Sequence, residues 1–427
     1  KWRYFVDDKC GSFWQVLPVS VTGRDTKENT TARYKFAVHA NVVCGEGGHK
    51  IFTFVPKHIP TGANFGLSNL LMTIFHAVKS GNLKPDTDSF VRHTDGGSDN
   101  VSVLTHFIHW LLVYLGVFNE ILWFRFPAGH SHTEVADRLF SIIKRLFESD
   151  GAHRVDPLQS FLELMPKIEL AFEKEVEGCV FQWDFANWDL RTMMKEMNVV
   201  SSSLKGISSK MVYRYKYDET MQDHGYVLVQ YKSNISWTGT ARDAEWSPIM
   251  RTQRTMNIGD GDGDAEPVEC NVSKPKGVRF VSKPPDLRIQ PRREPFDHKS
   301  EKHKPDKVCQ TILKKRSDDL SPASISFWKC LAKFHARHGE VAEQVPDMPH
   351  TINTEERSFA FDGLPRPFVD VMKAISRRFP RPFLPPDPFT AAPPASWDAL
   401  SPAVPMSAPA PQEEEGEACL RDPRREN

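Results

Sequence analysis

Five acidic residues lie where an apolar run of the sequence gives way to a turn or a helix: Asp7, Asp8, Asp95, Glu134 and Asp137. The most informative of them, Asp95, opens the turn DGGSDN at residues 95–100, between a predicted strand and a long amphipathic helix. In α/β proteins such positions often carry metal ligands and catalytic carboxylates. Acids at two strand ends and on a later helix therefore predict a divalent-metal site for phosphoryl transfer.

Two-metal phosphoryl transfer requires carboxylates that hold Mg²⁺ or Mn²⁺ ions about 3.5–4 Å apart. Carboxylate oxygens are suitable ligands for these ions. We therefore take Asp7, Asp95 and Asp137 as the candidate catalytic and metal-binding set. Asp8 competes with Asp7, because a shift of one residue along a strand reverses the face, and Glu134 competes with Asp137.

Each of these acids also has a purely structural alternative. Asp7 or Asp8 can initiate a turn, and Asp95 can form an Asx-turn within its glycine-rich loop. Glu134 and Asp137 can act as favourable charges at a helix N-terminus.

Polar residues near the acids are candidates for positioning a loop or a phosphate group: Asn100, His130 and His132. Asn100 can equally cap the helix that follows it, and the two histidines can form hydrogen bonds within their own loop. The sequence has no further ligands at zinc-binding spacing from them. We expect His106 and His109, inside the predicted helix, to be partly buried structural residues rather than ligands.

The spacing of apolar residues predicts a mixed α/β chain with the order β-β-β-α-β-α-β-α. Strands are predicted at residues 2–6, 34–44, 50–55, 89–94 and 121–126, and helices from the turn at 60–64 to Gly81, over 101–115 and over 133–147. This is the order of the ribonuclease H fold, in which an antiparallel three-stranded start precedes two parallel strands joined by helical crossovers. We expect one mixed sheet with helices on both faces and the first strand beside the fourth.

Two motifs carry a resemblance to a known family: DGGSDN at 95–100 and GHSHTEVADRLFS at 129–141. They resemble an uncharacterised, transposon-derived family of eukaryotic proteins that look like DDE-type transposases and integrases with a ribonuclease H-like core. The resemblance covers roughly residues 1–235 and implies nuclear, DNA-directed ancestry. The family's third motif places an acid four residues after its second histidine. Here that position is Ala136 and Asp137 follows it, so we prefer Asp137 as the third acid.

The composition of the chain changes near residue 246. Of the 32 prolines among its 427 residues, only 7 precede that position. Proline-rich polar chain buries too little apolar surface to offset the entropy lost on ordering. We therefore predict a core at 1–150, a helical and β-hairpin extension packed on it at 151–245, and a mostly disordered tail at 246–427. A short helix at 368–375 within this tail could bind partners.

Basic residues predict contact with nucleic acid, with DNA expected first and RNA as the alternative. Residues 274–316 hold 14 Lys or Arg against 5 Asp or Glu, a tract suited to electrostatic binding or nuclear import. The alternative explanation is a solvated basic linker without a binding role. The candidates in this tract and on a predicted hairpin are Arg214, Lys216, Lys232, Arg292, Arg293, Lys314, Lys315 and Arg316. Aromatic residues at 181–188 can stack on bases, although a satellite core is the commoner explanation.

The seven cysteines include no CxxC pair, so neither a disulfide framework nor a zinc ribbon is indicated. No stretch reaches 18 uncharged apolar residues, so we expect no membrane span and no membrane partner. A nuclear or cytoplasmic protein is expected rather than a secreted one. Because the chain begins at Lys1 within a predicted strand, we expect it to be part of a longer product.

The leading hypothesis is a DDE-type nuclease that cleaves or joins DNA strands with Mg²⁺ or Mn²⁺. The alternatives are a catalytically inactive nucleic-acid-binding module of the same fold and a protein-interaction scaffold. Metal binding separates the first hypothesis from the others, and a steep salt dependence of DNA affinity separates the second from the third. Protein partners are left open by the sequence, as is assembly into a homo-oligomer.

Overall fold

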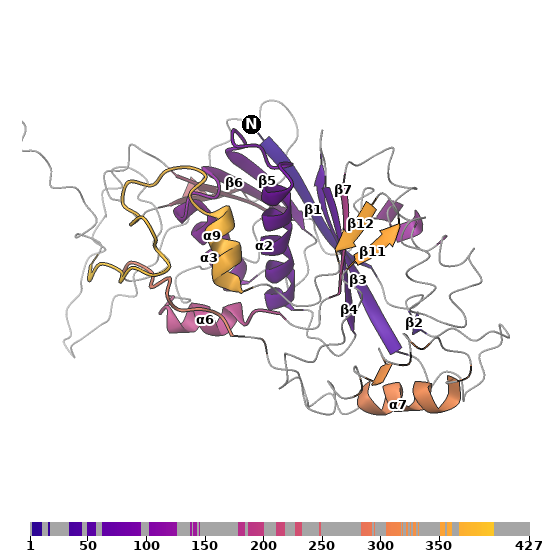
Figure 1. Ribbon diagram of the computed structural model, residues 1–427. Helices are drawn as coiled ribbons and strands as arrows, with labels where there is room; N and C mark the ends of the chain where they lie inside the picture. The colour runs from indigo at the N-terminus through magenta and orange to yellow at the C-terminus, as the bar shows by residue number, and fades with distance from the viewer. Residues whose placement is uncertain are drawn as a thin grey trace, which may run out of the picture.

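The computed structural model describes the chain in segments. They cover residues 2–10, 16–17, 34–44, 49–56, 62–94, 102–125, 137–138, 140–142, 145, 178–183, 187–199, 211–217, 227–232, 247–248, 283–292, 294, 305–316, 318, 322, 325, 328–329, 332, 351–354, 357–360 and 367–396. Within them one large sheet is covered by a layer of helices (Figure 1).

The large sheet has ten strands among the described residues, in the order β10-β9-β8-β6-β5-β1-β3-β4-β7, with β2 paired to β3. The strands are β1 (Trp2–Cys10), β2 (Val16–Leu17), β3 (Tyr34–Cys44), β4 (His49–Pro56), β5 (Ser89–Thr94), β6 (Glu120–Arg125), β7 (Gly178–Trp183), β8 (Val212–Lys216), β9 (Leu228–Lys232) and β10 (Ser247–Pro248). A separate two-stranded sheet pairs β11 (Thr351–Thr354) with β12 (Arg357–Ala360).

The centre of the sheet follows the order predicted from the sequence. β1, β3 and β4 are antiparallel neighbours, and β1, β5 and β6 are parallel neighbours. The predicted pairing of the first strand with the fourth is confirmed by the parallel ladder between β1 and β5. Two helices, α2 and α3, connect β4 to β5 and β5 to β6.

The predicted boundary near residue 150 does not divide the sheet. β8 adds to the edge of β6 in antiparallel fashion, and β9 completes the expected hairpin with β8. β7 extends the opposite edge, parallel to β4. The region at 151–245 therefore contributes strands to the same sheet.

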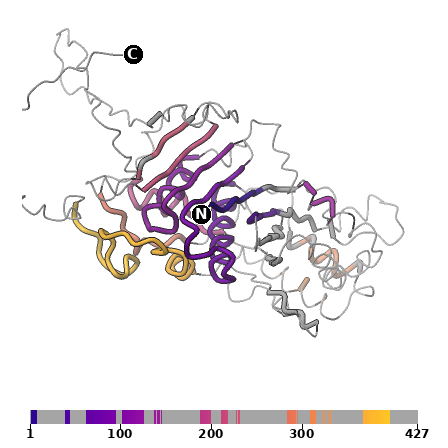
Figure 2. Tube along the Cα trace, turned by 90° about the horizontal axis from the view of Figure 1, so that it is seen from above, coloured from indigo at the N-terminus to yellow at the C-terminus, as the bar shows by residue number. Residues whose placement is uncertain are grey.

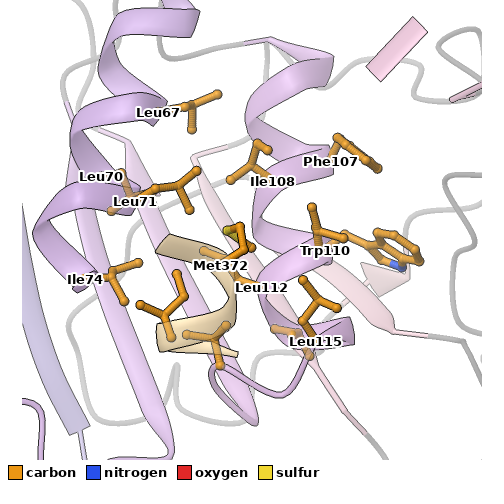
Figure 3. Close-up of a cluster of buried hydrophobic side chains, with 14 of the residues drawn as sticks. Leu67, Leu70, Leu71, Ile74, Phe107, Ile108, Trp110, Leu112, Leu115 and Met372 are labelled. Carbon is orange, nitrogen blue, oxygen red and sulfur yellow. The ribbon is translucent and has the colours of Figure 1, made fainter. Parts of the chain in front are cut away.

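The helices in the described segments are α2 (Ala63–Lys79), α3 (Val103–Tyr114), α6 (Leu190–Glu196), α7 (Pro305–Arg316) and α9 (Phe368–Ile375). α2, α3 and α9 lie side by side, and their apolar side chains interlock in one buried cluster with the sheet beneath (Figure 3). Of the predicted helix at 133–147, the described residues 137–138, 140–142 and 145 are helical. The helix predicted at 157–176 lies outside the described residues.

Glycines end both long helices, as the sequence predicts. Gly81 follows α2 with φ +75°, and Gly116 follows α3 with φ +67°. This left-handed conformation costs glycine little and is common just after a helix. At the other end of α3, the Ser102 side chain accepts a hydrogen bond from the backbone N–H of Thr105, which caps the helix.

β1 extends four residues beyond its predicted end at Val6. Asp7 and Asp8 lie inside the strand, opposite Asn41 and Ala40 of β3, and the ladder continues to Cys10. The turn-initiating alternative for these two acids is therefore wrong. Pairing with the long strand β3 supplies backbone hydrogen bonds that carry β1 past its apolar residues.

The assignment of residues 246–427 to a mostly disordered tail was too broad. Residues 283–292 and 367–396 pack on the core: Leu287, Phe368 and Phe383 are buried in the same cluster as α2 and α3. The helix predicted at 368–375 is confirmed with those bounds, but it packs on α2 instead of lying in a disordered chain. Figure 2 shows the yellow C-terminal segment against these helices.

No helix in the described part of the chain is long and apolar enough to cross a membrane.

Candidate functional site

The carboxyl ends of three parallel strands share one edge of the sheet. β1, β5 and β6 pair in parallel, and Thr94 at the end of β5 lies opposite Arg125 at the end of β6. Asp7 lies one residue past the last parallel pair of β1. The chain passes from Thr94 directly into Asp95, which itself lies outside the described residues. The fold therefore brings the first acid to the end of the sheet from which the chain enters the DGGSDN segment.

Asp7 faces the helical layer and forms a buried ion pair with Arg92. The alternation of side chains along a strand places Phe5 and Asp7 on one face of β1, and Phe90 and Arg92 on the same face of β5. The rings of Phe5 and Phe90 touch edge to face, with centroids 4.3 Å apart. The guanidinium Nε of Arg92 donates to Asp7 Oδ2 at 3.0 Å, and Nη2 donates to the same oxygen. Asp7 is 7% exposed and Arg92 only 1% exposed.

The other side of the Arg92 guanidinium faces α3. Its Nη1 lies 3.2 Å from Nε2 of His109. Because a guanidinium can only donate, His109 accepts at Nε2 and carries its own proton on Nδ1. Burial, together with the nearby charge of Arg92, holds the pKa of His109 well below its usual value. Arg92 thus lies between an ionised acid and a neutral histidine.

One turn earlier on α3, His106 extends this buried polar layer. Its Nδ1 pairs with the hydroxyl of Tyr215 on β8. Burial raises the pKa of Tyr215 well above its usual value, so the phenol keeps its proton and donates. Burial, reinforced by the charge of Arg125, lowers the pKa of His106 to about 3. Arg125 is itself 5% exposed, and its guanidinium lies 5.9 Å from the ring centroid of Trp123.

The buried histidines make stability depend on pH. An unfolded histidine takes a proton below its ordinary pKa of about 6.5, whereas folded His106 stays neutral down to about pH 3. Below pH 6.5 the unfolded chain therefore binds protons that the folded protein does not. The free energy of unfolding is highest above pH 6.5 and falls as the pH is lowered, by up to about 1.4 kcal/mol per pH unit for each such histidine. Urea unfolding at pH 7.5 and pH 5.5 measures this loss. His106→Asn keeps an acceptor for Tyr215 and should make the free energy of unfolding depend less on pH. An unchanged pH dependence would contradict this role of His106.

The predicted metal-binding set is only partly described. Asp7 is in the ion pair with Arg92, and Asp137 lies half-buried in the helical part of 133–147. Of Asp8 the structure describes only the backbone. The remaining predicted positions lie outside the described residues: Asp95, Asn100, His130, His132 and Glu134. In the described part of the chain, no group of three or more His, Cys, Asp or Glu side chains could hold a metal ion.

The predicted nucleic-acid-binding residues do not gather on one described surface. Arg214 on β8 is half-buried and pairs with Glu120 of β6. Lys216 on the same strand is half-buried, whereas Arg292 and Lys314 are exposed. α7, which carries Lys314, contacts β3, and the strands β6, β5 and β1 lie between β3 and β8. Arg293 lies outside the described residues, and only the backbone is described for Lys232, Lys315 and Arg316.

Sequence reasoning missed the partners of Asp7. Arg92 is the single charged residue in the strand SFVRHT, where every second residue from Phe90 faces the core. A lone arginine on the core face of a strand needs a buried counter-charge. This requirement is the signal in the sequence that could have identified Asp7 as its partner. His106 and His109 are fully buried rather than partly buried, and they pair with Tyr215 and Arg92. Trp188 is likewise buried in the core, as the satellite-core explanation for 181–188 expected.

Residues 26–235 match a family model described as a domain of unknown function, DUF7869. The match contains β3 to β9 and begins after β1, so the strand that carries Asp7 precedes it. Searches of the curated proteins and of the solved structures found no match.

Proposed function

We propose that this chain is a transposase-derived, nucleic-acid-processing protein with a ribonuclease H-like core. Its activity would be cleavage or transfer of DNA strands by divalent-metal phosphoryl transfer, through Asp7, Asp95 and Asp137. The observation that carries the proposal is the parallel pairing of β1 with β5, which places Asp7 beside the point where the chain enters Asp95. The antiparallel start β1-β3-β4, followed by β5 and β6 with helical crossovers, supports the fold.

The chemistry of the three acids suits Mg²⁺ or Mn²⁺, because these ions take oxygen ligands. Bound there, the ions would activate a nucleophile and stabilise the leaving oxygen. Asp7 differs from a freely available ligand, since Arg92 already contacts its Oδ2. Arg92 would orient that carboxylate toward the carboxyl ends of the parallel strands and would compete with the metal for its negative charge.

The ion pair also favours a second candidate function. A carboxylate neutralised by a buried guanidinium attracts a metal ion less strongly. Arg92 and Arg125 lie on adjacent strands and face the same layer, so the described residues at this end of the sheet include two buried guanidinium groups and the carboxylate of Asp7. The second candidate is therefore an inactive nucleic-acid-binding module that keeps the fold. Its DNA affinity should fall steeply with salt.

Asp95→Asn should abolish Mn²⁺-dependent nicking of a supercoiled plasmid and weaken Mn²⁺ binding measured by calorimetry. The amide is nearly isosteric with the carboxylate but lacks the charge that holds the metal. Asp86→Asn is the matched control, because Asp86 is exposed in the turn that precedes the other end of β5. Nicking that persists in Asp95→Asn would remove this residue from the mechanism. Nicking that persists with a chelator would remove the metal.

The same titration assigns the third acid. We expect Asp137→Ala to lower Mn²⁺ affinity more than Glu134→Ala, because Glu134 can be satisfied by free backbone N–H groups at the start of its predicted helix. A larger loss in Glu134→Ala would reverse the assignment. No Mn²⁺ binding by the wild-type protein, combined with salt-sensitive DNA binding, would favour the inactive module.

A further inference from the structure

The C-terminal segment, residues 367–396, lies against the ends of α2 and α3, although 268 residues of sequence separate Val113 from its partner Arg381. It begins with α9 and continues as a proline-rich stretch. It also lies outside the family match at 26–235. Three kinds of contact hold it in place.

The first contact is an apolar helix stripe. The buried side chains of α9 recur at the three- and four-residue spacing of one helix face: Phe368, Val371, Met372 and Ile375. Met372 points between α2 and α3 (Figure 3). Phe368 meets Trp188 edge to face, with ring centroids 5.3 Å apart. A helix that lays one stripe into a groove is a recurring mode of peptide recognition.

The second contact is a pair of hydrogen bonds between backbones. Beyond α9, the N–H of Arg377 donates to Leu115 O at 2.8 Å, and the N–H of Phe379 donates to Gly116 O at 2.9 Å. The carbonyl oxygen of Phe379 comes so near that a Cβ on Gly116 would lie 2.1 Å from it. Gly116 therefore has two reasons to be glycine, its positive φ and the closeness of the segment.

The third contact comes from two arginines. Arg381 is 7% exposed and donates to Val113 O, Phe118 O and the side-chain oxygen of Asn119 at 3.0–3.2 Å. Its guanidinium also lies 3.9 Å from the ring centroid of Tyr217. Arg378 donates to Val117 O at 3.1 Å and lies over the ring of Phe118. These arginines occupy the last carbonyls of α3 and the loop after it, which a helix end leaves unsatisfied.

We propose that the ends of α2 and α3, with the loop at 115–119, form a peptide-binding site whose ligand is the C-terminal segment of this same chain. An apolar stripe, backbone pairing and charged anchors together specify a linear sequence, as they do in complexes between separate molecules. The segment therefore stays bound when its covalent connection is cut. A free peptide of the same sequence exchanges with it.

The test uses the full chain with a specific protease site in place of residues 361–366. After cleavage, the fragment that contains 367–396 should co-elute with the folded core in size-exclusion chromatography. A fluorescent synthetic peptide of residues 367–396 should then exchange into the cleaved protein, as measured by anisotropy. Separation of the fragment from a folded core, or unfolding of the core on cleavage, would overturn the proposal.

Two glycines provide matched variants. Gly116→Ala should weaken peptide binding at least about tenfold, a change of about 1.4 kcal/mol. Gly81→Ala should leave it within about twofold, because Gly81 also has positive φ but a Cβ added there would have nothing within 4 Å. Equal binding by the two variants would contradict the site. Variant peptides repeat the test on an unaltered core: Arg381→Ala should bind at least about tenfold more weakly and Lys373→Ala about as well as the original sequence.

Discussion

Replacing Arg92 with methionine should lower the free energy of unfolding by about 3–5 kcal/mol. This is the usual cost of removing one partner from a buried ion pair, because the other charge stays buried without compensation. Asp7 and Arg92 are both almost completely buried. The neutral ring of His109, which now accepts from Arg92, cannot replace the guanidinium as a counter-charge for Asp7. Urea denaturation at neutral pH measures the loss. The free energy of unfolding should depend on urea concentration with the same slope in both proteins.

Two further variants make this result specific. Arg288→Met removes the same side chain from an exposed pair with Asp286 and should leave the unfolding midpoint nearly unchanged. The double variant Asp7→Leu/Arg92→Met removes both charges and should recover most of the loss, since apolar side chains often replace a buried pair without cost. A double variant as unstable as Arg92→Met alone would show that the ion pair is not what stabilises this position.

Arg381→Lys should destabilise the protein by roughly 2–4 kcal/mol although it keeps the charge. The planar guanidinium donates hydrogen bonds to three acceptors at once and lies over the ring of Tyr217. A lysine ammonium cannot reach all three acceptors together. The carbonyl oxygens of Val113 and Phe118 would lose a charged donor in a buried place. Thermal and urea unfolding of the full chain measure the effect.

The control for Arg381 lies four residues earlier in the same segment. Arg377 is exposed, and its side chain contacts only one backbone oxygen, that of Pro386, among the described hydrogen bonds. Arg377→Lys should therefore unfold almost as the wild-type protein does. Similar losses in both lysine variants would indicate a general effect of charge in the segment, and not the hydrogen bonds of the Arg381 guanidinium.

Local patterns in the sequence were enough to predict the central strands and their order. β3 has its predicted bounds because apolar residues occupy every second position over a long run: Phe36, Val38, Ala40 and Val42. α3 ends where expected because Gly116 can take the left-handed conformation. The end of β1 was misjudged because Asp7 and Asp8 interrupt its apolar run, and the partner strand that extends it lies about 30 residues later.

Contacts between residues far apart in the sequence could not be predicted from these local patterns. Arg92 and Asp7 are 85 positions apart, and no local spacing links them. The C-terminal segment was assigned to a disordered tail because its prolines dominated the composition. The stripe at 368, 371, 372 and 375 shows that a proline-rich segment of 30 residues can contribute to the core.

The long separation between α3 and Arg381 sets an order of events during synthesis. Val113 precedes Arg381 by 268 residues, and a ribosome adds about 5–20 residues per second. Val113 is thus added to the growing chain roughly 13 to 54 seconds before Arg381, the residue that completes the end of α3. During that interval the surface that will receive Met372 and Arg381 is exposed to the cell. Any chain terminated before residue 367 keeps this exposed surface permanently, which would mark it for chaperones and proteases.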